Sequence, residues 1–255
     1  MNDEMTQRNH TESTDAASSW VAGADGFRDG WVVALWQPST GTWRRRTVNT
    51  VADLLDLPEA PVALGLDMVI GLPDAARPGG RACDRAARQL LGHPRSSSVF
   101  SPPVYDALSA DAYDAAQRLQ RASAPNAPGL TIQAYHLFPK LRAVARALTP
   151  KRQERVREVH PELAFYAMND DRPVAASKHD AEGRTARIRL LETHGCPDIG
   201  GALDAMARSP VGADDVLDAH AACWTARRIF DDTAQRCPSD DPPRNARGLR
   251  MEIWR

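Results

Sequence analysis

The sequence lacks any apolar run near the roughly 20 residues that a transmembrane helix needs. Its first four residues, MNDE, have neither the basic nor the apolar region of a secretory signal peptide. We therefore expect a cytoplasmic protein that does not enter a membrane. Cysteines are few and show no C-x-x-C spacing, which predicts neither a zinc cage nor a disulfide framework. The four are Cys83, Cys196, Cys223 and Cys237.

Aromatic residues make up only 6% of the 255 residues, and they do not alternate with basic residues as on surfaces that stack single-stranded bases. The formal net charge of −1 argues against a protein that coats nucleic acid through bulk charge. The charge is nevertheless uneven, because residues 139–157 hold seven Lys or Arg against one Glu, a net charge of +6. Such a run is commonly a solvated helix face. It also predicts a track for a phosphate backbone, with Lys151 and Arg152 as contacts.

What the chain does contain is enough apolar sequence for a large core. Residues 20–255 have the length and composition of one large domain, with 42% hydrophobic residues in the chain. Residues 1–19 carry scarcely any apolar side chain, so they cannot offset the entropy cost of ordering. We predict a flexible tail at 1–19 and a single domain at 20–255.

The strand predictions begin at the start of this domain. Two apolar runs joined by a glycine-containing turn predict a β-hairpin at 20–36, and alternating side chains predict a third strand at 43–48. The nearly unbroken apolar run at 62–70 is typical of a strand covered on both faces. Shorter strands are predicted at 157–160, where Pro161 ends the run, and at 249–254.

Segments rich in helix-forming residues lie between these strands. Good helix formers such as Ala, Leu, Arg and Gln predict helices at 51–57, 81–91, 111–122, 132–148, 182–194 and 214–230. Three antiparallel strands, a crossover and further strands predict an α/β fold with a mixed sheet. The helices between the 62–70 and 157–160 strands form a predicted helical insertion at about 74–150.

Two aspartates lie at strand positions where acids are uncommon. Asp25 ends the first apolar run and precedes Gly26, so it is either a turn residue that bonds its own backbone or a site residue. Asp67 lies inside the 62–70 run, where an unpaired ionised carboxylate would be costly to bury. Its structural alternative is an ion pair with Arg77 or Arg81.

A third group of acids opens the predicted helix at 214–230. Asp214 and Asp215 suit a first helical turn because acids interact favourably with the helix dipole there. Asp215 and Asp218 lie on one helix face, and Asp218 has apolar neighbours in the sequence. Two acids in that setting repel each other unless a cation lies between them.

A further group lies near the strand at 157–160. Glu158 and His160 alternate along that strand and therefore point the same way, and Glu162 follows Pro161. Ordinary hydration at a strand end is the alternative for these residues. We take Glu158 as an auxiliary ligand or a base that orients water, and His160 and Glu162 as auxiliary residues.

These groups can converge, because the end of the first strand, the strand after the crossover and the start of the last helix can meet at one pole of a sheet. Clusters that offer only oxygen ligands suit Mg²⁺ or Mn²⁺. Paired ions of this kind stabilise the attacking and leaving oxygens of a phosphoryl displacement. No serine, cysteine or lysine nucleophile motif competes with the acids.

Seven stretches of the chain, in order over about 21–228, resemble one protein family. They are GADGFRDGW (23–31), LDMVIGLP (66–73), GRACD (80–84), SSVF (97–100), EVHPE (158–162), EGR (182–184) and DDVLDA (214–219). The family is domain-of-unknown-function family 429, found in bacteria and archaea and described as predicted nucleases of ribonuclease H-like fold.

The resemblance implies a three-layer, ribonuclease H-like fold, in which a five-stranded mixed sheet has the Asp25 strand in its middle and helices on both faces. It also implies a metal site, for which Asp25, Asp67, Asp215 and Asp218 match the expected ligands. The spacing of Asp215 and Asp218 resembles that of the final-helix acids in Holliday-junction resolvases. Three basic residues match family motif positions and are predicted to hold phosphate oxygens: Arg81, Lys178 and Arg184. Surface solvation or pairing on a helix is the alternative for each of them.

Residues and resemblance together predict a Mg²⁺- or Mn²⁺-dependent nuclease that hydrolyses phosphodiester bonds of DNA or RNA with two ions. One ion would activate water and the other would stabilise the leaving 3′ oxygen. One alternative is a nucleotide-binding protein related to actin-like ATPases and sugar kinases, which share the sheet and a glycine-rich hairpin. Another is a non-catalytic binding module that uses the acids structurally. The sequence predicts no oligomeric state.

Overall fold

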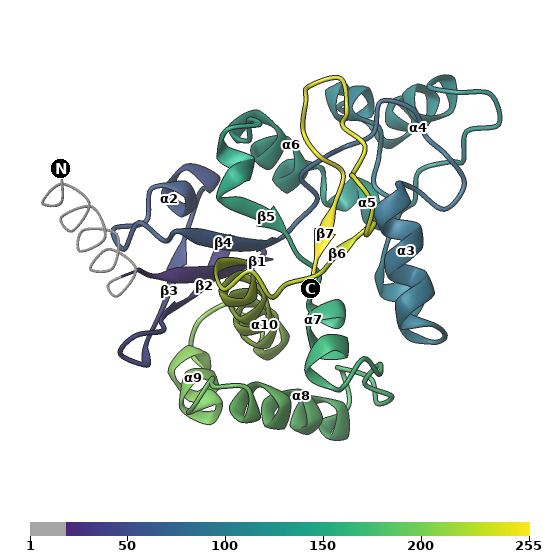
Figure 1. Cartoon of the computed structure of the whole chain (residues 1–255). Coiled ribbons are helices and arrows are strands. Elements are labelled where there is room, and N and C mark those ends of the chain that lie inside the picture. Colours follow the sequence, from purple (N-terminus) through teal and green to yellow (C-terminus); the bar gives the residue numbers. More distant parts are fainter. Residues whose placement is uncertain (1–18) are drawn as a thin grey trace, which may run out of the picture.

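The computed structural model of the protein describes residues 19–255, so the tail predicted at 1–19 lies, except for Ser19, outside the described residues. Five strands form one sheet in the order β3-β2-β1-β4-β5, with the Asp25 strand in the middle (Figure 1). They are β1 (Val21–Phe27), β2 (Gly30–Gln37), β3 (Thr42–Val48), β4 (Ala63–Asp67) and β5 (Val156–Glu158). β2 is antiparallel to β1 and β3, whereas β4 is parallel to β1 and β5, so the predicted mixed sheet is confirmed.

The first three strands form the predicted antiparallel meander. A two-residue turn, Arg28 and Asp29, joins β1 to β2, and Phe27 is the register partner of Gly30. β2 is almost wholly buried, whereas β3 has only exposed and half-buried residues. Arg44 and Arg46 both form ion pairs with Glu59.

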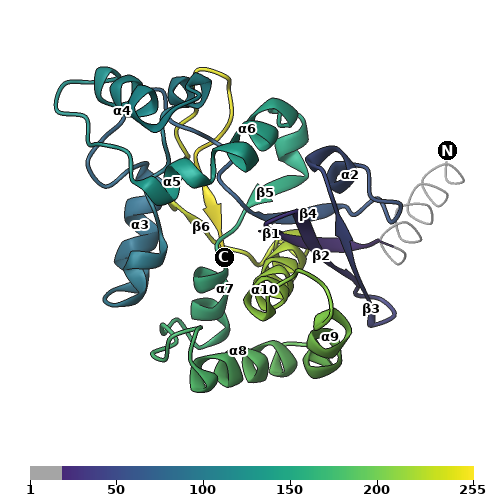
Figure 2. The same cartoon turned by 180° about the vertical axis from the view of Figure 1, so that it is seen from behind.

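Helices cover both faces of this sheet (Figure 1 and Figure 2). The covering helices are α2 (Val51–Leu55), α6 (Phe138–Ala147), α9 (Ile199–Met206) and α10 (Ala213–Phe230). Leu54 of α2 and Val144 of α6 lie in one apolar cluster with Leu64 of β4. On the opposite face, Val216 of α10 lies in a cluster with Val32 of β2. The two clusters make a three-layer arrangement of helix, sheet and helix.

The contact between α10 and the sheet depends on two glycines. Gly23 and Gly65 are register partners in the parallel β1–β4 pair. A Cβ atom on Gly23 would lie 2.0 Å from the backbone nitrogen of Cys223, and one on Gly65 would lie 2.4 Å from the carbonyl oxygen of Ala222. Only glycine therefore allows the backbone of α10 to lie directly on both strands.

The remaining elements flank this core. Between β4 and β5 come α3 (Ala82–Leu91), the 3-10 helices Arg95–Ser98 and Tyr105–Ser109, α4 (Tyr113–Ala122), α5 (Ile132–His136), α6 and the 3-10 helix Arg152–Glu154. After β5 come α7 (Pro161–Met168) and α8 (Ala181–Thr193), and near the end of the chain β6 (Arg236–Cys237) and β7 (Ile253–Trp254). None of the helices within residues 19–255 is long and apolar enough to cross a bilayer.

Four of the predicted elements differ from the structure. The strand predicted at 62–70 is shorter, because β4 ends at Asp67. The helix predicted at 132–148 is two helices, α5 and α6, because Pro139 lacks an N–H group and fits only the first turn of a new helix. β5 ends at Glu158, since Pro161 starts α7, which the sequence did not predict. The strand predicted at 249–254 shortens to β7, which pairs with β6 in a separate two-stranded sheet.

Candidate metal centre

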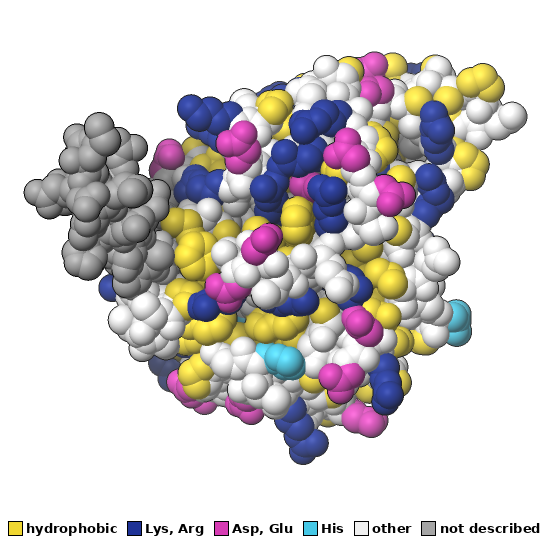
Figure 3. Space-filling view, viewed as in Figure 1, with side chains coloured by type: hydrophobic (Ala, Val, Ile, Leu, Met, Phe, Trp, Pro, Cys, Tyr) yellow, Lys and Arg dark blue, Asp and Glu magenta, His cyan; other side chains and the backbone are white. Residues whose placement is uncertain are grey.

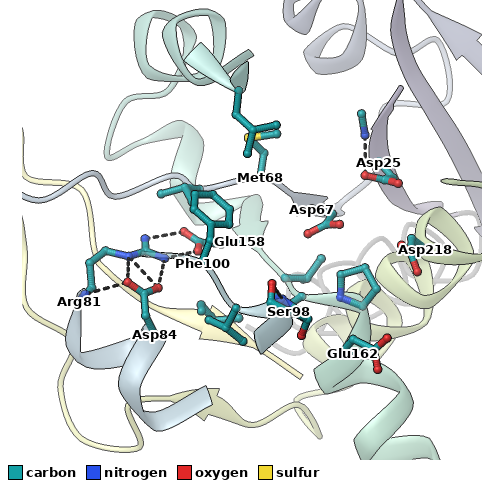
Figure 4. Close-up of a pocket in the computed structure, with 18 of the residues that line it drawn as sticks. Asp25, Asp67, Met68, Arg81, Asp84, Ser98, Phe100, Glu158, Glu162 and Asp218 are labelled. Carbon is teal, nitrogen blue, oxygen red and sulfur yellow. Dashed lines mark hydrogen bonds and ion pairs between the residues drawn. The ribbon is translucent and has the colours of Figure 1, made fainter. Parts of the chain in front are cut away.

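Three aspartates from distant parts of the chain meet at the carboxyl ends of β1 and β4. Asp25 and Asp67 are register partners on these strands, and Asp218 lies on α10. One carboxylate oxygen from each lies within 4.8 Å of those of the other two. Their carboxylates face a common space (Figure 4). We call Asp25, Asp67 and Asp218 the carboxylate triad.

The two glycines explain why the carboxylate triad forms. Side chains alternate along a strand, so Asp25 and Asp67, each two residues after Gly23 or Gly65, face the same side as α10. The close approach of α10 at these glycines then brings Asp218 alongside them. The fold thus assembles the triad from backbone geometry, before any ligand is considered.

Asp25 also makes the local contact expected of a turn aspartate. The Gly26 N–H donates to Asp25 Oδ1 at 2.6 Å, while the residue is only 9% exposed. The two interpretations of Asp25 are therefore compatible, since one oxygen accepts the backbone hydrogen bond and the carboxylate still belongs to the triad. Among residues 19–255, Asp67 forms no ion pair with Arg77 or Arg81, so that alternative prediction is wrong.

The carboxylate triad is electrostatically unfavourable without a cation. Burial, then the charges of Asp67 and Asp218, raise the pKa of Asp25 well above its ordinary value. Burial and Asp218 raise the pKa of Asp67 to about 8, and burial raises that of Asp218 to about 6. Oxygen-only donors that repel one another suit a hard divalent cation such as Mg²⁺ or Mn²⁺.

Lys178 reaches the carboxylate triad from the loop between α7 and α8. Its Nζ donates to Asp218 Oδ2 at 2.9 Å. Burial opposes the charged ammonium, but Asp218 and Asp67 raise the pKa of Lys178 above its ordinary value. Lys178, which was predicted to hold a phosphate oxygen, thus contacts the Asp218 carboxylate directly.

A second buried cluster surrounds Arg81. Its guanidinium donates to Asp84 and Glu158, with 2.9 Å between Nη1 and Glu158 Oε2, and also to the Gly71 carbonyl oxygen. The Ile70 N–H donates to the same Glu158 oxygen at 2.8 Å. Figure 4 shows this cluster beside the triad but separate from it. Glu158, predicted as an auxiliary ligand, and Arg81, predicted to hold phosphate, are therefore paired with each other.

His160 and Glu162 lie at the start of α7. Glu162 Oε1 accepts a hydrogen bond of 2.6 Å from the buried Arg187, which neutralises its charge. His160 Nε2 lies 3.3 Å from the Ser98 carbonyl oxygen, and burial lowers its pKa. The neutral imidazole thereby connects α7 to the loop that contains Ser98.

Four further predicted residues do not line the cavity at the carboxylate triad. Asp215 accepts the Gly212 N–H at 2.9 Å, as a capping residue in the first turn of α10. Arg184 lies on α8 and is partly exposed. Lys151 and Arg152 are exposed after α6, and Arg152 donates to the Ala147 carbonyl oxygen at 2.7 Å.

The carboxylate triad opens into a cavity of about 230 Å³. Its lining carries the triad, Lys178, the Arg81 cluster, His160 and Glu162. Apolar side chains complete the lining, including Met68, Val69, Val99, Phe100, Leu137 and Ile253. A space of this size and mixed character can admit part of a substrate next to the acids.

Lys140 is a site neighbour that was not singled out in the sequence. Its Nζ donates to the Gly30 carbonyl oxygen at 2.8 Å and lies 4.7 Å from the centroid of the Trp31 ring. A Cβ atom on Gly26 would be 2.9 Å from Lys140 Cδ, so this lysine packs against the turn after Asp25. The basic run at 139–157 was the only signal that included it.

The sheet order and the helices on both faces define a three-layer α/β protein, and this architecture is consistent with a ribonuclease H-like fold. A family model described as "Protein of unknown function (DUF429)" matches residues 23–243. The chain therefore belongs to the DUF429 family, as the sequence motifs predicted. Searches of curated proteins and of solved structures gave no match.

Proposed function

We propose that the protein is a Mg²⁺- or Mn²⁺-dependent nuclease that hydrolyses phosphodiester bonds. The observation that carries this proposal is the carboxylate triad, with three buried or half-buried acids whose oxygens lie within 4.8 Å of one another. Unpaired carboxylates in that position would be costly to bury without a cation. Family membership agrees with the proposal, although the family description states no activity.

The donor set fits a hard divalent ion. Carboxylate oxygens are the ligands that Mg²⁺ and Mn²⁺ prefer, and the triad offers one oxygen from each of three separate elements. His and Cys ligands, which would favour zinc, are absent from this cluster within residues 19–255. Asp25, Asp67 and Asp218 would hold the ion.

A bound ion would polarise the scissile phosphate and generate the attacking nucleophile from water at neutral pH. The chain's own residues would do the rest. Lys178, beside Asp218, can contact a phosphate oxygen that enters the cavity. The apolar side chains of the lining, such as Phe100, would exclude water from the substrate.

Nucleic acid is the partner that we propose for this site. Lys and Arg side chains gather over the region of α6, β5 and β7 in Figure 3, which is drawn from the same side as Figure 1. Several arginines of 139–157 contact the protein itself, as Arg155 does with the Leu55 carbonyl oxygen at 2.7 Å. Arg146, Lys151 and Arg152 are exposed, and they are the residues that we assign to the phosphate track.

The kinase-like alternative has less support. Actin-like ATPases and sugar kinases hold nucleotide between two domains of this kind, whereas residues 19–255 contain one five-stranded sheet and one two-stranded sheet. Calorimetry with ATP and Mg²⁺ separates the two functions. Tight ATP binding would favour the kinase-like alternative.

The test of the nuclease proposal is a cleavage assay with Mn²⁺ and a panel of single-stranded, duplex and junction DNA and of RNA. We expect the wild-type protein to cut at least one substrate. Asp25→Asn and Asp218→Asn should cut it about 100-fold more slowly or worse, because each removes a ligand. Asp204→Asn, at an exposed position on α9, is the matched control and should cut like wild type. Failure of the wild-type protein on every substrate would contradict the proposal.

A further inference from the structure

We propose that the ammonium of Lys178 takes the place of a second metal ion, so that the carboxylate triad binds one divalent ion and not two. This inference rests on the proposed metal site. It concerns how many ions bind, which can be measured whether or not the protein cleaves nucleic acid.

The charges of the carboxylate triad and of Lys178 support a single ion. The carboxylate triad carries three negative charges when ionised, and Lys178 contributes one positive charge at 2.9 Å from Asp218. The remainder of two negative charges matches one divalent cation. A second divalent ion would leave a net positive charge in a buried site, which is unfavourable.

The other acids of the cavity are held by arginines. Arg81 is shared by Asp84 and Glu158, and Arg187 pairs with Glu162. Both arginines are buried, with exposed fractions of 4% for Arg81 and 1% for Arg187. The Arg81 cluster keeps one negative charge but lies apart from the triad (Figure 4), so its carboxylates stay with their arginine and do not supply ligands for a second ion.

The loop that carries Lys178 is built into the fold. Arg187 Nη1 donates to the Ala176 carbonyl oxygen at 3.3 Å, while its Nη2 holds Glu162. A Cβ atom on Gly183 would lie 1.9 Å from the Ser177 carbonyl oxygen, so α8 packs against this loop without a gap. The backbone on the N-terminal side of Lys178 is thus fixed from two directions.

This anchoring distinguishes Lys178 from a surface lysine that pairs with any nearby acid. An unanchored lysine would swing into solvent when a metal ion arrives, because a surface ion pair is weak. The Lys178 side chain is 35% exposed, but it starts from a fixed backbone and contacts an Asp218 side chain that is only 8% exposed. Asp25 and Asp67, paired in register, remain as the carboxylates that the lysine does not contact directly.

The experiment is a Mn²⁺ titration of the full chain, read by isothermal calorimetry and by electron paramagnetic resonance. We expect one tight site in wild type, with the spectrum of an isolated Mn²⁺ ion. Lys178→Met should bind a second Mn²⁺ ion and show coupling between the two spins. Lys178→Arg, which keeps the charge, should bind one, and Arg208→Met, at an exposed position with no role in the site, is the control that should match wild type.

Several results would overturn the inference. Two tight ions with coupled spins in wild type would exclude it, even if the Lys178→Met variant failed to fold. A single ion in folded Lys178→Met, or no ion in wild type, would also exclude it. One bound ion in wild type and a second in Lys178→Met, with no cleavage by wild type of any substrate, would leave this inference standing and contradict only the nuclease proposal.

Discussion

Gly23 on β1 lies beside Gly65 on β4, and the backbone of α10 rests on both. This pair of glycines sets the distance between helix and sheet, and the acids that follow each glycine by two residues face the same helix. Packing and site geometry are therefore coupled, because a side chain at either glycine would push Asp218 away from the strands.

Gly23→Ala tests this coupling. The new methyl group would collide with the backbone of Cys223 and Ala219, which cannot rotate away, so we expect a loss of about 3 kcal/mol in the free energy of unfolding. Urea denaturation measures this loss. Gly200→Ala on α9 is the control, since its new methyl group would meet open space outside its own helix, and it should be neutral or slightly stabilising. Equal stability of Gly23→Ala and wild type would contradict the close approach.

The stability of the metal-free protein should fall as pH rises. The pKa of Asp67 is about 8 in the folded protein against an ordinary 3.8, so between these values the folded state holds a proton that the unfolded state has lost. The contribution of Asp67 to the free energy of unfolding is fully present below about pH 4. It declines as the pH rises to about 8 and does not change further above that pH. Thermal melts in chelator across this range measure the slope.

Asp67→Asn should reduce that slope and melt above wild type at pH 8 in chelator, because it removes the buried charge. Mn²⁺ should stabilise wild type most at high pH, since ligands bind metal in their deprotonated form. The exposed Asp204→Asn should keep the wild-type profile. A metal-free wild-type protein that grew more stable between pH 5 and pH 8 would contradict the raised pKa values.

Arg81→Met should cost about 3 to 5 kcal/mol of folding free energy, because it leaves Asp84 and Glu158 buried without their cation. Chemical denaturation gives the magnitude. Arg146→Met, at an exposed position on α6, should change stability little. If Arg81→Met instead folded as stably as wild type and only weakened nucleic acid binding, the contact with phosphate would be its main role.

Charge reversal of the exposed pair, Lys151→Glu with Arg152→Glu, should weaken binding to a nucleic acid and reduce its dependence on salt. Fluorescence anisotropy at several salt concentrations, with Ca²⁺ in place of Mn²⁺, measures both effects. Charge reversal of Arg244, an exposed residue outside 139–157, changes the net charge in the same direction and serves as the comparison. Unchanged affinity in the 151/152 variant would remove this segment from the proposed interface.

Much of the fold could be predicted because its strands have strong local patterns. The hairpin at 20–36 and the apolar strand after the crossover are visible as alternation and as an unbroken apolar run. α7 was missed because Pro161 was interpreted as the end of a strand, although proline also suits the first position of a helix. α9 was missed because Gly200 and Gly201 lower helix propensity, which packing of Ile199 and Ala202 overcomes.

The candidate site was predictable where an acid interrupts an apolar pattern, as at Asp67 and Asp218. The pairing of charges could not be predicted from the sequence, because Glu158 and Arg81 are 77 residues apart and only the folded chain brings them together. The same holds for Lys140, whose contact with Gly30 spans 110 residues. Asp215 shows the limit of spacing arguments, since its side chain caps α10 while Asp218, one turn later, reaches the triad.

The arginines of β3 have a consequence for how the sheet meets other molecules. β3 is an outer strand, and such strands offer unpaired backbone groups to which another chain can add. Arg44 and Arg46, which form ion pairs with Glu59, place charge along that edge of the sheet. On the opposite border β5 is three residues long, and the chain directly after it is bridged by Trp254. Both borders are thereby protected against the strand addition that leads to aggregation.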